Sequence, residues 1–126
     1  MANLDFDALR EPLRIVKGDD VTFSIQFTDC DEDGVSTPLD ITSWVFEMKI
    51  TDLSGAVVAT INSTLTDGSQ LTKSASDSVT DTLNVKIGKV NTVKVPMHNA
   101  SYYIKAVDNN SLEHTILAGD VIALKR

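Results

Sequence analysis

A run of acidic residues is the clearest chemical motif in the sequence. Asp29, Asp31 and Asp33 alternate with other residues, Gly34 follows them, and Asp40 lies eleven positions after Asp29. Carboxylates at positions 1, 3, 5 and 12 of a loop, with glycine at position 6, form the ligand pattern of calcium-binding loops. The pattern suggests a calcium site formed by the four aspartates, and no other cofactor is expected.

The same segment also fits an ordinary turn. Asp40 is shorter than the glutamate that binds calcium with both oxygens, Pro38 interrupts the loop, and the flanking sequence predicts strands rather than helices. Aspartate and glycine satisfy the backbone geometry of exposed turns without any metal. Two interpretations therefore stay open, a calcium loop and a solvent-exposed connection between Phe27 and Trp44.

The remaining reactive residues do not form a catalytic pattern. His98 and His114 have no serine, cysteine or histidine at a spacing that defines a triad or a metal box. Cys30 lies among four acidic residues, whose negative charge disfavours a nucleophilic thiolate. The six glycines are scattered singly, which gives no phosphate-binding loop. The sequence predicts a protein that is not an enzyme and has no small-molecule substrate.

Charge is concentrated in the first third of the chain. The 126 residues include 18 acidic and 11 basic side chains, a formal net charge of −7. Residues 1–40 hold ten acidic and three basic side chains, whereas residues 41–126 hold eight of each. The acidic balance argues against binding to nucleic acid through its phosphates. If the protein docks by charge, a basic partner surface is expected to face residues 5–40.

The sequence also bounds the setting of the protein. The longest apolar runs are only a few residues, and the N-terminus lacks the basic and hydrophobic regions of a secretion signal. These features predict a soluble chain without membrane contact, made in a cytoplasm. The single cysteine excludes an internal disulfide.

The elements that must position these residues are predicted to be strands. Val, Ile and Thr make up 35 of the 126 residues, and apolar and polar side chains alternate with the period of a half-buried strand. A long exposed loop is expected over residues 62–79. Strands are expected over residues 13–16, 21–28, 44–50, 56–61, 82–87, 90–96, 100–107 and 113–124. Seven to eight short strands between turn signals predict an all-β, antiparallel β-sandwich.

The N-terminus is predicted to differ from this sandwich. Residues 1–12 mix apolar and acidic side chains without the periodicity of a core element, so they are expected to form an extended arm ahead of a single domain at residues 13–126. Leu4, Phe6 and Leu9 would anchor the arm on a neighbouring subunit. The alternative is a frayed terminus that packs weakly on its own domain.

The order of the motifs resembles a known pattern. It runs from Lys17-Gly18-Asp19-Asp20 before the first core strand to Asp31-Glu32-Asp33-Gly34, Leu39-Asp40-Ile41-Thr42, Gly55-Ala56-Val57-Val58, Tyr102–Val107 and Leu117-Ala118-Gly119-Asp120-Val121. Small bacteriophage virion domains similar to the N-terminal domain of the baseplate upper protein family show this order. The resemblance implies an immunoglobulin-like sandwich in the virion, an attachment or adaptor module that performs no catalysis.

The expected function is therefore that of a non-enzymatic virion structural protein in the tail, baseplate or fibre-attachment region. It would be made in the bacterial host cytoplasm and would assemble with other virion proteins, as a homo-oligomer or a symmetric assembly, through sheet edges and the N-terminal arm. A capsid decoration protein is the alternative in the same class. A calcium-dependent carbohydrate-binding module is the alternative in another class.

Overall fold

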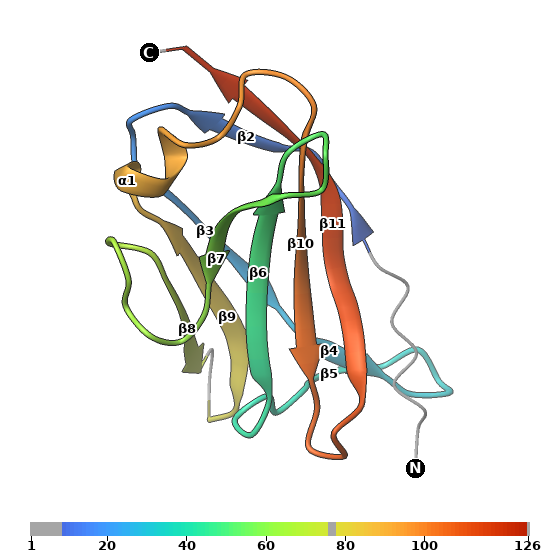
Figure 1. Cartoon of the computed structure of the whole chain (residues 1–126). Coiled ribbons are helices and arrows are strands. Elements are labelled where there is room, and N and C mark those ends of the chain that lie inside the picture. Colours follow the sequence, from blue (N-terminus) through green and yellow to red (C-terminus); the bar gives the residue numbers. More distant parts are fainter. Residues whose placement is uncertain (1–8, 76–77, 126) are drawn as a thin grey trace.

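The computed structural model describes residues 9–75 and 78–125, and these residues fold into two packed β-sheets (Figure 1). The larger sheet has the order β1-β11-β10-β6-β7, and β2 also pairs with β11. The smaller sheet has the order β3-β9-β8, and β4 and β5 form a separate hairpin. The strands are β1 (Leu9–Arg10), β2 (Leu13–Val16), β3 (Val21–Gln26), β4 (Thr28–Cys30), β5 (Ser36–Pro38), β6 (Val45–Thr51), β7 (Val57–Ile61), β8 (Gln70–Ala75), β9 (Thr80–Ile87), β10 (Ala100–Val107) and β11 (Glu113–Leu124).

The alternating sequence pattern explains why the two sheets pack on each other. Phe46, Met48 and Ile50 of β6 point inward and are at most 4% exposed, while the residues between them are partly exposed. In β9 of the other sheet, residues 83, 85 and 87 likewise point inward and are buried. One face of each sheet thus contributes to a single core, as the period of two requires. The all-β fold predicted from the sequence is confirmed.

The strand order identifies the sandwich as immunoglobulin-like. In that fold one sheet contains the second, fifth and fourth strands, and the other contains the third, sixth and seventh. Here β3-β9-β8 corresponds to the first set, β6-β10-β11 to the second, and β7 extends the larger sheet beside β6. The chain departs from the common pattern at its start, because β1 and β2 both run parallel to β11 instead of pairing with β3.

Two predicted segments differ from the structure. The segment expected to be a loop over residues 62–79 contains β8, which pairs antiparallel with β9. The strand expected over residues 90–96 is replaced by the short helix α1 (Lys89–Thr92). Within the described part of the chain, no helix is long and apolar enough to cross a membrane.

Side-chain contacts explain why the second of these predictions is wrong. The valines of this segment favour a strand locally, but Asn91 and Thr92 are buried. The Asn91 side chain donates to Ser69 Oγ at 2.7 Å. The Thr92 hydroxyl donates to the carbonyl oxygen of Asp19 at 2.9 Å and accepts from the Gly18 N–H at 3.1 Å. These tertiary hydrogen bonds hold the segment as a helical turn over one end of the sandwich.

Candidate interaction site at the free edge of β3

The acidic motif folds as a hairpin and its turn. Asp29 lies in β4 opposite Thr37 of β5, so its backbone belongs to a two-stranded ladder. Asp31 opens the turn, and its Oδ1 accepts hydrogen bonds from the backbone N–H groups of Asp33 and Val35, both at 2.9 Å. This is the turn chemistry expected of aspartate near glycine.

Asp40 lies beyond that hairpin and has its own local partner. Its Oδ1 accepts from the Thr42 hydroxyl at 2.5 Å and from the Thr42 N–H at 3.0 Å. These hydrogen bonds, the hydroxyl first, hold the pKa of Asp40 below its ordinary value. Among the described residues, no group of three or more His, Cys, Asp or Glu side chains is arranged to hold a metal ion. The four aspartates are thus not brought together, and calcium binding stays a prediction.

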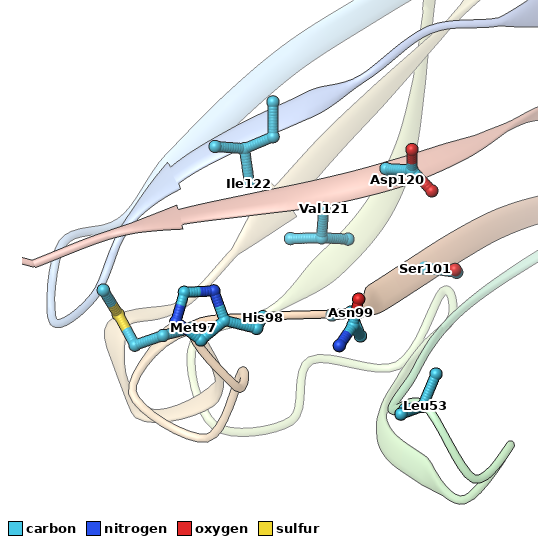
Figure 2. A pocket seen from close by; sticks show the side chains of 9 residues that line it. Leu53, Met97, His98, Asn99, Ser101, Asp120, Val121 and Ile122 are labelled. Carbon is cyan, nitrogen blue, oxygen red and sulfur yellow. The ribbon is translucent and has the colours of Figure 1, made fainter.

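His98 lies in a hollow of about 450 Å³ at the end of the sandwich (Figure 2). The hollow is also lined by Leu53, Met97, Asn99 and Asp120. A histidine and a carboxylate in one pocket could exchange a proton if they were in contact. Figure 2 shows instead that the imidazole and the Asp120 carboxylate lie at opposite ends of the hollow, with Val121 between them. This arrangement gives no acid–base pair.

His114 has a partner that sequence spacing did not reveal. Its Nε2–H donates to Oδ2 of Asp108 at 2.9 Å, and its ring stacks on Trp44 at a centroid distance of 6.3 Å. Oδ1 of Asp108 also accepts from the N–H groups of Asn110 and Leu112. The hydrogen bond from His114 is the main cause that lowers the pKa of Asp108. The carboxylate therefore stabilises the turn between β10 and β11.

The strongest candidate for an interaction site is the outer edge of β3, because β3 is the terminal strand of the smaller sheet. Phe27, the residue after β3, donates its N–H to the Asp81 carbonyl oxygen at 2.8 Å, so its backbone polar groups point toward β9. Hydrogen bonding alternates along an antiparallel ladder. Residues 21, 23 and 25 therefore also bond to β9, and the backbone groups of Thr22 and Ser24 point toward the free edge.

A cleft of about 500 Å³ runs along this edge, between β3 and the segment of β1 and β2. Val21, Phe23 and Ile25 of β3 line one side and are partly buried. The rest of the lining includes the apolar residues Pro12, Leu13 and Leu117 together with Glu11, Arg14 and Tyr102. The cleft occupies the place that the first strand of an immunoglobulin-like sandwich takes when it pairs beside β3.

The cleft stays open because the first strands are held on the other sheet. The Glu11 N–H donates to the Ala118 carbonyl oxygen at 3.0 Å, and the Tyr102 hydroxyl donates to the Glu11 carbonyl oxygen at 2.6 Å. Burial, and then the charge of Glu11, raise the pKa of Tyr102 above its ordinary value of 10.0, so the phenol remains a donor. Gly119 permits this close approach, since a Cβ there would lie 2.2 Å from the Glu11 carbonyl oxygen.

β3 differs from the other terminal strands in having little protection against pairing. Its sequence Val-Thr-Phe-Ser-Ile-Gln contains no charge and no proline. On the edge of β8, the Leu71 N–H already donates to the Asn62 carbonyl oxygen at 2.8 Å, and Lys73 adds a charge. The ladder between β6 and β7 carries a register shift at Ile50 and Thr51. Charges, irregularities and covering segments discourage strand addition, so β3 is better suited to accept a strand than β7 or β8.

The predicted arm is only partly within the described residues. Leu4 and Phe6 lie outside them, so their role as anchors stays a prediction. Leu9 lies in β1, whose backbone pairs with Leu117 of the same chain. The last residues of the predicted arm thus belong to the larger sheet. The free edge of β3 has no signal in the sequence, because alternation does not indicate which strand ends a sheet.

Comparisons with known proteins add little to this site. No family model matches the chain, and no curated protein matches it. The ZIG-8 IG1 homodimer structure is similar at 10% identity and a TM-score of 0.42, over 97% of this chain and 86% of the other. The ZIG-8–RIG-5 IG1–IG1 heterodimer is similar at 9% identity and a TM-score of 0.40, over 97% and 90%. These similarities are weak, so the fold assignment rests on the strand order of the chain itself.

Proposed function

We propose that this chain is a non-enzymatic structural protein of a bacteriophage virion, an adaptor of the tail, baseplate or fibre-attachment region that assembles through a sheet edge. The observation that carries the assembly function is the free, uncharged edge of β3 above an apolar cleft. Such an edge offers backbone hydrogen bonds for affinity and apolar positions for specificity. The assignment to a virion is supported by the order of sequence motifs described above.

The charge distribution favours a partner with a basic surface at one end of the molecule. The exposed acidic residues of the β4–β5 hairpin project beside the sandwich (Figure 1). A basic surface on a neighbouring virion protein would complement this hairpin and speed association at low salt. Binding through the hairpin and through the β3 edge would give the adaptor two separate contacts.

Mass spectrometry of purified particles tests the proposal, because a structural protein is present in them in repeated copies. We expect the chain to remain with the particles through density-gradient purification. Electron microscopy of particles made without the gene then separates the two structural roles. Intact heads with defective tails support the adaptor, and fragile heads indicate a capsid decoration protein instead. A chain that is expressed in infected cells but absent from particles would refute the proposal.

A further inference from the structure

We propose that two copies of this chain pair antiparallel along the free edges of their β3 strands, so that their three-stranded sheets join into one continuous sheet. The inference rests on the proposed assembly function and names both the edge and the partner. The hydrogen-bond pattern, the side chains of β3 and its charge each support it.

The backbone of β3 is self-complementary. Thr22 and Ser24 point their N–H and C=O groups away from β9, as the alternation from Phe27 shows. In an antiparallel pair centred on Phe23, Thr22 lies opposite the partner's Ser24, and Ser24 lies opposite the partner's Thr22. Each strand then bonds with the groups that it otherwise leaves to water. A two-fold axis makes both halves of this contact identical, which is the usual geometry of a homodimer.

The side chains of the same strand fit this register. Val21 lies opposite the partner's Ile25, and the two Phe23 side chains meet at the axis. In each copy these side chains line the apolar cleft and are only partly buried. Pairs of aromatic and β-branched residues across antiparallel strands are among the favourable ones. The second strand would therefore cover apolar surface that the single chain leaves accessible.

Charge also selects this register. β3 itself has no charged residue. Asp19 and Asp20 precede its start, and Glu11 and Arg14, of opposite charge, line the cleft beside it. Centred on Phe23, the pair places Asp20 opposite the partner's Gln26 rather than opposite another acid. The Asp20 carboxylate also accepts from the Lys89 N–H at 2.7 Å. Each copy still carries a net charge of −7, so added salt should strengthen the dimer by screening the repulsion.

The described part of the same chain does not fill this edge. β1 and β2, which precede β3 in the sequence, are held on the larger sheet by β11. The turn from Val16 to Val21 is closed by a hydrogen bond from the Asp19 N–H to the Val16 carbonyl oxygen at 3.0 Å. Among the described residues the edge is thus open to a strand from another molecule, and a second copy supplies one that matches it in backbone hydrogen bonds and side chains.

Sedimentation equilibrium over a concentration series tests the pairing, with the unchanged full chain and four variants of it. Ser24→Pro removes one outward N–H without touching the ladder to β9. Ser24→Ala is the matched control, because it loses the same hydroxyl, which donates to Asn84 at 2.7 Å, but keeps the N–H. The double variant Thr22→Lys/Ser24→Lys changes only exposed side chains and sets like charges across the axis. Circular dichroism checks that each version is folded.

We expect the unchanged chain and Ser24→Ala to dimerise, and Ser24→Pro and the double lysine variant to dimerise at least about tenfold more weakly. Dimers that persist in both variants would overturn the inference but leave the proposed assembly function standing. A chain that stays monomeric at high salt would also overturn the inference. The proposed virion function would then still be tested separately, by mass spectrometry of purified particles. In the variant Leu4→Asp/Phe6→Asp the dimer should persist. Loss of the dimer in this variant would indicate that the N-terminal segment makes the contact, and this would also overturn the inference that β3 pairs with β3.

Discussion

The contact between β11 and the first strands predicts a large effect from a small substitution, Gly119→Ala. The added Cβ would lie 2.2 Å from the carbonyl oxygen of Glu11 and 2.8 Å from its carbonyl carbon. Because these are backbone atoms, the segment of residues 9–13 must shift by about 1 Å to restore van der Waals contact. Overpacking of this kind costs about 1–3 kcal/mol of unfolding free energy.

The same shift removes a hydrogen bond. The Tyr102 hydroxyl donates to the Glu11 carbonyl oxygen at 2.6 Å, and a net contribution of about 1 kcal/mol is typical of such a bond. We therefore expect Gly119→Ala to lower the free energy of unfolding by about 2–4 kcal/mol in total. Tyr102→Phe alone should cost about 1 kcal/mol, because the buried ring remains.

Urea unfolding followed by the fluorescence of Trp44, the single tryptophan, measures these values. The exposed Ser101→Ala, in the neighbouring strand β10, is the control and should change stability by at most about 0.5 kcal/mol. In the double variant Gly119→Ala/Tyr102→Phe the two losses should not add, since the first substitution already separates the hydroxyl from Glu11. Full additivity, or a cost of Gly119→Ala within the range of the control, would refute the reasoning.

Three further predictions concern other parts of the chain. Hydrogen bonds hold the pKa values of Asp40, Asp52 and Asp108 below their ordinary 3.8. The contribution of these carboxylates to folding stability is therefore complete above pH 3.8 and is lost as the pH falls through the lowered pKa values. Urea midpoints measured from about pH 6 to pH 2.5 should fall, and Asp108→Asn should flatten the decline; a flat profile in the unchanged chain would contradict this. Calorimetric titration with millimolar calcium separates the two interpretations of the acidic motif: the exposed turn, in which the four aspartates are not grouped, predicts no heat, and saturable heat that is lost in Asp31→Asn would support the calcium loop. Cys30 is exposed and should react fully with a thiol reagent in the folded protein; slow reaction limited by unfolding would contradict its placement.

The sequence predicted those strands whose side chains alternate on a half-buried sheet. β6 and β10 were located because Phe46 to Ile50 and Tyr102 to Ala106 point to the core at every second position. Tyr102 is buried and Tyr103 is partly exposed, as the alternation implies. Period-two patterns record burial on one face, which is the dominant constraint on such strands.

The missed elements are those in which local pattern and tertiary context disagree. Leu71 is the only buried residue of β8, so the polar sequence of this strand resembles that of a loop. α1 contains β-branched residues but is fixed by the buried polar contacts of Asn91 and Thr92. These contacts join residues far apart in the chain, and no local window contains them.

The candidate site was missed for a related reason. The position of β3 at the end of its sheet depends on where β1 and β2 pair, and that is decided by the close approach of Glu11 to Gly119 and Tyr102. Neither contact leaves a periodic signal in the sequence. The acidic motif is visible in the sequence, and in the structure the Asp31 carboxylate accepts two backbone hydrogen bonds within a turn.

Amide hydrogen exchange of β3 tests most directly the claim that this protein assembles through its free strand edge. In dilute solution the amides of Thr22 and Ser24 should exchange rapidly, while those of Phe23 and Ile25 are protected by β9. In the assembled state, at high concentration or in purified particles, the amides of Thr22 and Ser24 should exchange at least about tenfold more slowly. Unchanged exchange at these two amides on assembly would contradict the claim.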